Sequence, residues 1–207
     1  MHFKKCLEIG CHFTNLISEY DSCKNAKIYC VDPVESFLNK VPKKENVVKL
    51  NYAVTDDDES KRDFFYISET VANKNNLPEW ATTMGSLLPY HPTIEHFNWK
   101  NLQQKIKVPC ISFKALINEY SLEDIDFLHI DTEGYDYKIL MSVYENNIFP
   151  EVIKFESKLM STEELSMVIS LFSEKKYAAT YGITKDFNGV SYNTILHKNE
   201  LADELLT

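Results

Sequence analysis

The sequence predicts an α/β fold in which a mostly parallel sheet has helices on both faces and ends in an antiparallel hairpin. Short apolar runs, which suit buried strands, alternate with segments of helical spacing through most of the chain. The last two strand-like runs flank residues 186–189, a turn signal that joins neighbouring strands as a hairpin. A length of 207 residues with 44% hydrophobic content suits one core. We therefore expect residues 1–207 to form one domain.

The expected elements follow the apolar pattern along the chain. We predict strands at residues 4–9, 27–32, 47–54, 63–67, 125–131, 152–156, 177–182 and 191–197. We predict helices at residues 11–23, 135–145 and 160–176. The last of these opens with Ser161 and has Glu164 three residues later, which is the pattern of a capping box.

Carboxylates follow the apolar run at residues 125–130. Asp131, Glu133 and Asp136 come directly after it, and Gly134 permits a tight turn before the next helix. Ligands of open α/β sheets bind at the carboxyl ends of the strands, so these acids are expected to lie at a site. The alternative is a solvated acidic turn that only starts a helix.

A second group of residues at the start of the chain has the same construction. Glu8 lies in the first strand, Gly10 follows it, and Asp32 ends the second strand. Gly10 and Asp32 are separated by about the 20 residues that place a carboxylate on ribose hydroxyls in a βαβ unit. Together with the strand end at Asp131, these two strand ends predict a nucleoside pocket.

The charge of the pocket favours a cationic nucleoside. A dinucleotide site needs further glycines and a helix N-terminus for its pyrophosphate, but Thr14 stands where a later glycine would fall, and Glu8 would repel the anion. S-adenosylmethionine carries a sulfonium and an ammonium, which carboxylates at Glu8 and Asp131 would attract.

The same segments resemble the FkbM-like S-adenosylmethionine-dependent methyltransferases, which are largely O-methyltransferases of natural products and sugars. The matching segments are residues 8–10, 31–33, 51–56, 85–87, 108–116 and 129–135. The resemblance covers most of residues 4–157 and implies a Rossmann-like seven-stranded methyltransferase sheet. Cys11, His12, Thr14 and His129 depart from the usual pattern of the family. The resemblance, together with the spacing of the strand-end residues, implies that S-adenosylmethionine lies against Glu8, Gly10, His12, Asp32, Pro33, Ala53, Val54 and Asp131.

Methyl transfer to a hydroxyl needs a group that orients the acceptor and accepts its proton. Asp131 is the first candidate and Glu133 the second, with His91, His12 and His129 as alternatives because histidine titrates near neutral pH. We expect the substrate side of the site to include Ser86, His91, Tyr135 and Glu156, although Glu156 alternatively pairs with a lysine. A divalent metal on Asp131, Glu133 and Glu156 is a variant that we favour less than a metal-free site.

Residues 68–107 interrupt the alternation of strands and helices. Long segments of weak periodicity in compact domains are often lids or binding loops, and this one holds both tryptophans, Trp80 and Trp99. We expect a lid or substrate-binding insertion; the alternative is that its aromatic residues only pack it onto the sheet. Because the first strand begins almost at Met1, we also expect either a domain excised from a longer polypeptide or a lid made entirely by this insertion.

Composition limits the partners and the compartment. A net charge of -9 argues against a nucleic-acid partner, and no apolar stretch approaches a membrane span or a signal peptide. The five cysteines form an odd set without a Cys-x-x-Cys pair, which favours a reducing, cytoplasmic setting. Two alternatives to a methyltransferase stay open, namely an NAD(P)-dependent oxidoreductase and a noncatalytic methyltransferase-like binding module.

Overall fold

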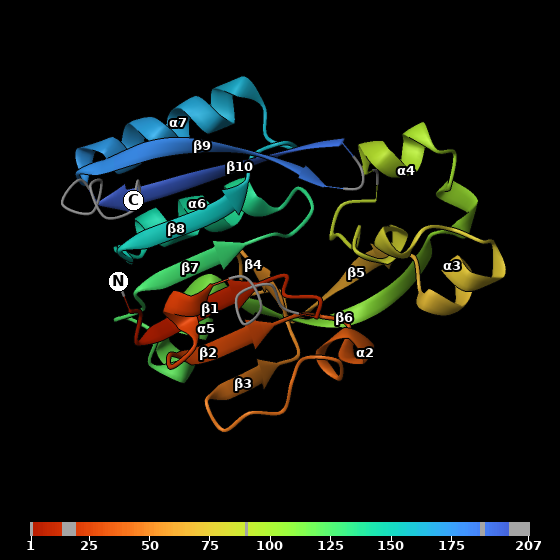
Figure 1. The fold of residues 1–207 in the computed structure, drawn as a ribbon, viewed down its shortest axis with the longest axis horizontal. Coiled ribbons are helices and arrows are strands. Elements are labelled where there is room, and N and C mark those ends of the chain that lie inside the picture. The colour runs from red at the N-terminus through yellow and green to blue at the C-terminus, as the bar shows by residue number, and fades with distance from the viewer. Residues whose placement is uncertain (1, 14–19, 90, 187–188, 199–207) are drawn as a thin grey trace.

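The main sheet of the molecule has seven strands. The computed structural model describes residues 2–13, 20–89, 91–186 and 189–198, with the backbone alone for residues 183–186 and 189–192. The strands are β1 (Lys5–Ile9), β2 (Lys27–Val31), β3 (Val47–Leu50), β7 (Phe127–Ile130), β8 (Val152–Glu156), β9 (Tyr177–Asp186) and β10 (Gly189–Lys198). Their order is β3-β2-β1-β7-β8-β10-β9 (Figure 1).

The direction of the strands confirms the predicted mixed sheet. β1 pairs in parallel with β2 and β7, β2 with β3, and β7 with β8. β10 is antiparallel to both β8 and β9, so the predicted C-terminal hairpin is present. Its turn residues 187 and 188 lie outside the described residues.

Two faces of the central strands are buried, which explains why these strands are continuous apolar runs. Leu7 and Ile9 of β1 belong to a large core with the helices α5 (Phe113–Tyr120), α6 (Asp136–Glu145) and α7 (Thr162–Glu174). Cys6 points to the opposite face and packs in a second cluster with Cys23 and Phe127. Of the helix predicted at residues 11–23, residues 14–19 lie outside the described part; the described residues at its two ends are not α-helical, since residues 12–13 form a turn and η1 (Asp21–Cys23) is a short 3-10 helix.

The predicted capping box is present at the start of α7. The Ser161 hydroxyl accepts from the Glu164 amide, and the Glu164 carboxylate accepts from the Ser161 amide. All five cysteines are buried and none forms a disulfide bond. In the described part of the chain, no helix is both long and apolar enough to cross a membrane.

A second, three-stranded sheet corrects the prediction for residues 47–54 and 104–112. The expected strand at 47–54 divides into β3 and β4 (Ala53–Thr55), and β4 pairs with β6 (Gln104–Ser112), which also pairs with β5 (Lys61–Tyr66). β6 was not predicted, because its start is exposed and Pro109 argues against a central strand. Pro109 fits because pairing with β5 ends at this residue and pairing with β4 begins at Cys110.

The insertion is helical rather than irregular. Its described residues form four short helices: α3 (Glu69–Lys74), η2 (Glu79–Thr82), α4 (Pro92–His96) and η3 (Lys100–Leu102). It has a small core of its own around Ile67 and Met84, and the ring of Trp80 lies 5.3 Å from Trp99 and 5.5 Å from Phe97. Part of its aromatic content therefore packs the insertion itself.

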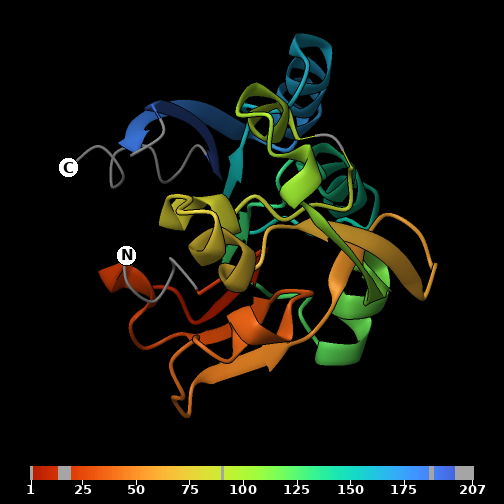
Figure 2. The ribbon, with the colours of Figure 1, turned by 90° about the vertical axis from the view of Figure 1, so that its right-hand side faces the viewer.

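The insertion lies beyond the carboxyl ends of the parallel strands. In Figure 1 the arrowheads of β2, β3 and β7 point toward α2 (Glu35–Leu38), α3 and α4, and Figure 2 shows that side facing the viewer. Loops at these strand ends and the insertion thus meet on one side of the sheet.

Candidate active site

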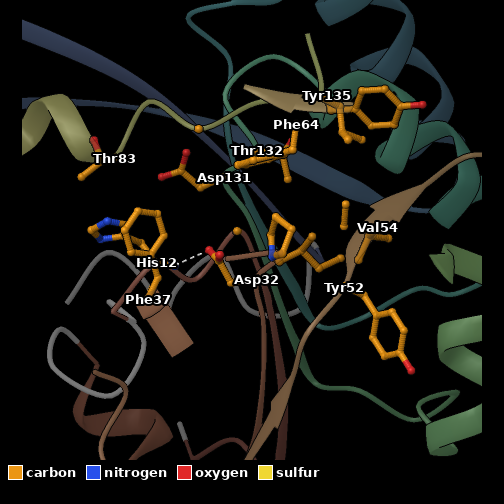
Figure 3. Close-up of a pocket in the computed structure, with 16 residues that line it drawn as sticks. His12, Asp32, Phe37, Tyr52, Val54, Phe64, Thr83, Asp131, Thr132 and Tyr135 are labelled. Carbon is orange, nitrogen blue, oxygen red and sulfur yellow. Dashed lines mark hydrogen bonds between the residues drawn. The ribbon is translucent and has the colours of Figure 1, made fainter. Parts of the chain in front are cut away.

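A cavity lies at the carboxyl ends of β1, β2 and β7, below the insertion (Figure 3). Eight of the residues predicted for the site line it: Gly10, His12, Asp32, Pro33, Ala53, Val54, Asp131 and Tyr135. The remaining lining residues are Ile9, Phe37, Tyr52, Phe64, Thr83, Gly85, Leu87 and Thr132. Figure 3 shows Thr83, His12 and Asp131 toward one end of this cavity and Tyr52 and Val54 toward the other.

Gly10 allows the loop after β1 to reach the end of β7. Its φ is +80°, and a Cβ at this position would lie 1.8 Å from the backbone oxygen of Asp131. The two strands are joined at the same place, because the Asp131 amide donates to the Ile9 carbonyl over 2.9 Å. Only glycine fits this conformation and this approach, and the close approach leaves backbone rather than a side chain facing the cavity.

Asp32 is held rigidly at the end of β2. One carboxylate oxygen accepts from the Val34 amide at 2.8 Å and the other from the His12 amide at 2.9 Å (Figure 3). Burial raises the pKa of Asp32 to about 7, against the opposing effect of these two N–H donors. The predicted ribose acid is therefore fixed in place, with both oxygens retaining lone pairs for hydroxyl donors.

His12 forms one wall of the cavity. Its backbone has a φ of 45°, and its ring lies 4.0 Å from Phe37 and 4.5 Å from Phe13, centroid to centroid. Burial lowers the pKa of His12 to about 4, so the imidazole is neutral at pH 7. Both ring nitrogens are buried and have no hydrogen-bond partner among the described residues. Buried polar atoms of this kind are normally satisfied, so the wall fits a ligand that carries polar groups.

Glu8 lies outside the cavity lining, contrary to its predicted contact with the cofactor. Only 1% of Glu8 is exposed, and its carboxylate lies 3.2 Å from the Nδ1 atom of His129, which is also buried. Glu8 lies inside β1, level with Cys30 of β2 and His129 of β7, whereas Asp32 and Asp131 follow two residues later, beyond the ends of those strands. The carboxylates at the cavity itself are therefore Asp32 and Asp131.

The far end of the cavity is mainly apolar. The predicted residues Ala53 and Val54 are buried there, beside Tyr52 and Phe64. The sequence did not predict Phe64, because its approach to β4 depends on pairing through β6. An apolar slot of this composition suits the flat face of a nucleobase.

Three carboxylates gather where β7 and β8 end. Asp131, Glu133 and Glu156 each place one oxygen within 4.8 Å of the others, and all three are half-buried. Burial, followed by the charges of Glu133 and Glu156, raises the pKa of Asp131 well above its usual range. Asp131 alone of the three lines the cavity, so it connects this cluster to the cofactor side.

Asp136 does not join this cluster through its own contacts. It is 1% exposed and accepts from the Thr132 hydroxyl at 2.7 Å and from the Thr132 amide at 3.3 Å. It begins α6, where a carboxylate is favourable to the helix dipole. The acid that the sequence placed with Asp131 and Glu133 therefore stabilises the turn.

His91 holds Glu133 rather than the cavity. Its Nδ1 atom accepts from the Thr93 amide at 3.1 Å at the start of α4, so the proton is on Nε2, which donates to the Glu133 carboxylate at 2.8 Å. Burial lowers the pKa of His91 to about 4. The residue is therefore a neutral donor that fixes the orientation of Glu133.

Ser86 reinforces the same junction. Its hydroxyl donates to the Glu133 carbonyl at 2.8 Å and accepts from the Leu88 amide at 3.0 Å. Glu133 has a φ of 52°, which few residues other than glycine adopt, and these contacts stabilise it. Ser86 and His91 thus clamp the insertion onto the loop that follows β7.

Tyr135 presents its ring to the cavity but not its hydroxyl. The hydroxyl donates to the Asp56 carboxylate and accepts from the Arg62 guanidinium at 2.7 Å. Figure 3 shows this hydroxyl directed away from Asp131. Tyr135 therefore joins the main sheet to the second sheet.

The seven-stranded order, with one antiparallel strand between β8 and β9, is that of the Rossmann-like methyltransferase fold. The sequence profile of the methyltransferase FkbM domain matches residues 8–178, and the chain belongs to this family. This membership confirms the predicted family and cofactor, and it assigns the chain to methyltransferases rather than to NAD(P)-dependent oxidoreductases. A comparison with curated protein sequences found no match.

Several solved structures are similar in fold. An rRNA methylase from Streptococcus thermophilus has a TM-score of 0.48 at 11% identity and covers 96% of this chain and 89% of its own. A precorrin-6y C5,15-methyltransferase from Geobacter metallireducens has a TM-score of 0.44 at 11% identity, over 96% of this chain and 82% of its own. A putative methyltransferase from Thermoplasma acidophilum has a TM-score of 0.45 at 12% identity and covers 95% of this chain and 69% of its own.

The residues present fit the cofactor that this class requires. The glycine approach at Gly10, the fixed carboxylate of Asp32 and the unsatisfied imidazole of His12 are features of a polar ligand site. Bound there, S-adenosylmethionine supplies a methyl group on a positively charged sulfur.

Proposed function

We propose that this protein is an O-methyltransferase that acts on a hydroxyl of a small molecule or of a sugar in a glycan. The observation that supports the proposal most is the position of Asp131, which belongs both to the cofactor cavity and to a cluster of three carboxylates. A carboxylate at this junction is within the part of the site where a hydroxyl acceptor and the methyl donor must meet.

In this proposal Asp131 orients the acceptor and accepts its proton. A carboxyl group whose pKa is raised is a stronger base than an ordinary one, and burial beside Glu133 and Glu156 raises that of Asp131. A positively charged ligand nearby would act in the opposite direction and keep Asp131 ionised, which a base requires. Glu133, held by His91, is the second candidate.

The net charge of -9 supports a small-molecule or carbohydrate acceptor over a nucleic acid. We further propose that residues 1–207 act as one methyltransferase domain and that the insertion covers the site, since Thr83, Gly85 and Leu87 of this segment line the cavity.

Calorimetry followed by a transfer assay tests this function. S-adenosylhomocysteine should bind the full chain with measurable heat, and incubation with methyl-labelled S-adenosylmethionine and an extract of glycans and small metabolites should label a hydroxyl-bearing compound. Binding of S-adenosylhomocysteine without any labelled product would favour the noncatalytic binding module. Label found on nitrogen or carbon would contradict O-methylation.

A further inference from the structure

A groove outside the cofactor cavity shares a wall with it. This outer groove is lined by Phe13, Pro78, Glu79, Trp80 and Thr83. Thr83 also lines the cofactor cavity, at the end where Figure 3 shows Asp131 and His12. The outer groove therefore begins at the end of the cavity that holds the candidate base, and not at the apolar end near Val54.

A third hollow supports this continuity. It is lined in part by His12 and Phe13 from the loop after β1, and by Glu69 and Glu79 from the insertion. His12 is a wall shared with the cofactor cavity, and Phe13 and Glu79 are shared with the outer groove. His12, Phe13, Glu79 and Thr83 thus place the cofactor cavity, the third hollow and the outer groove next to one another.

The outer groove presents aromatic surface on a firm support. The ring of Trp80 is backed by Phe97 and Trp99, at 5.5 and 5.3 Å between ring centroids. The ring centroid of Phe13 lies 4.5 Å from that of His12, and Phe13 is 42% exposed. A ligand with an apolar face would cover Phe13 and contact Trp80 at little cost in side-chain entropy, because the Trp80 ring is already packed.

The charge of the groove selects among such ligands. Glu79 is the one ionisable residue in its described lining, and a carboxylate accepts hydrogen bonds but cannot donate them. A ligand with hydroxyl donors at its rim would satisfy Glu79, whereas an anionic ligand would be repelled.

We propose that the outer groove binds the methyl acceptor, and that this acceptor is an uncharged ring compound with one apolar face and several rim hydroxyls, as in a neutral pyranose. The inference rests on the proposed function and adds to it a site and a charge preference. In this arrangement the ring lies against Phe13 and Trp80, Glu79 accepts from a rim hydroxyl, and another hydroxyl enters past Thr83 toward Asp131.

Two matched glycosides test the inference. The full chain, saturated with S-adenosylhomocysteine, is titrated with phenyl β-glucopyranoside and with its anionic counterpart, phenyl β-glucuronide, and binding is followed by ligand-observed NMR. The glucoside should bind at least about tenfold more tightly than the glucuronide. Trp80→Ala should weaken glucoside binding by about tenfold, and Glu79→Gln should bring the glucuronide to within about threefold of the glucoside.

Controls separate this inference from structural damage and from the proposed function. Tyr181→Ala removes an aromatic side chain that is 60% exposed on β9 and should leave glucoside binding unchanged. Phe13→Ala repeats the test of Trp80→Ala without disturbing the core of the insertion, and the heat of S-adenosylhomocysteine binding reports folding.

Glucoside binding that survives both Trp80→Ala and Phe13→Ala overturns the inference. It is also overturned if neither glycoside binds to protein that is saturated with S-adenosylhomocysteine. A lack of heat with S-adenosylhomocysteine itself would instead overturn the proposed function.

Discussion

Replacing Gly10 by alanine tests the arrangement on which the cavity depends. The φ of +80° at Gly10 lies in the region that L-residues avoid, at a cost of about 1–2 kcal/mol. The new Cβ would also lie 1.8 Å from the Asp131 backbone oxygen, whereas real Cβ contacts stay beyond 3.0 Å. The ends of β1 and β7 must therefore separate by about 1 Å, which strains the hydrogen bond between Ile9 and Asp131 at a further cost of about 1 kcal/mol.

The expected result for Gly10→Ala is a loss of about 2–3 kcal/mol in the free energy of unfolding, with Tm lowered by roughly 10 °C. Affinity for S-adenosylhomocysteine should fall by more than tenfold even at temperatures where the variant is fully folded, because the loop that forms the cavity wall is displaced. Thermal unfolding monitored by circular dichroism, together with calorimetry at 10 °C, measures both effects.

Gly182→Ala is the matched control. Gly182 lies in β9, and a Cβ there would meet its nearest atom at 3.6 Å, an ordinary contact. This variant should keep the wild-type Tm to within about 2 °C and the wild-type affinity for S-adenosylhomocysteine. If Gly10→Ala behaved like Gly182→Ala, the close approach of β1 and β7 would not be what builds the site.

Three further predictions concern the charges of the site. Asp131→Asn should lower the rate of methyl transfer by about 10²–10⁴-fold. It should also weaken the binding of S-adenosylmethionine more than the binding of S-adenosylhomocysteine, whose sulfur is uncharged. Transfer near the wild-type rate would exclude Asp131 as the base. Burial raises the pKa of Asp32 to about 7, so the folded state holds this proton more tightly than the unfolded state, and stability should fall as pH rises from about 4 to 7. This fall amounts to at most about 4 kcal/mol in the free energy of unfolding, and Asp32→Asn should remove it. Tm measured between pH 4 and 7 checks this: if Tm fell with pH as steeply in Asp32→Asn as in the wild type, the buried carboxyl would be contradicted. Methyl transfer should persist after exhaustive treatment with EDTA, because a carboxylate base needs no Lewis acid to accept a hydroxyl proton; activity lost with EDTA and restored by Mg²⁺ would instead assign a cation to Asp131, Glu133 and Glu156.

Local patterns in the sequence were enough to predict the main sheet and the edge of it at which the cavity lies. The parallel strands are short apolar runs because both of their faces are buried, and the turn glycine and strand-end acids follow at fixed spacings. Gly10, Asp32 and Asp131 were predicted from this logic, and all three line the cavity. The capping box at Ser161 was predictable for the same reason, since both of its partners lie within one helical turn.

Only the tertiary structure decided which chemically similar residues line the cavity. Glu8 and Asp32 are acids on neighbouring strands, and the parallel register places them on the same face of the sheet. Glu8 lies inside β1, where it pairs with His129, whereas Asp32 follows the end of β2 and lines the cavity. His91 was expected to contact substrate, but its Nε2–H donates a hydrogen bond to Glu133, a residue 42 positions away.

The second sheet was beyond prediction for the same physical reason. β6 consists of a half-exposed stretch with a proline, and it becomes a strand because β4 and β5 meet it from far along the chain. Periodicity and turn signals indicate the conformations that local segments prefer. Which side chains share a cavity depends on contacts between segments, and those contacts form only when the whole chain packs.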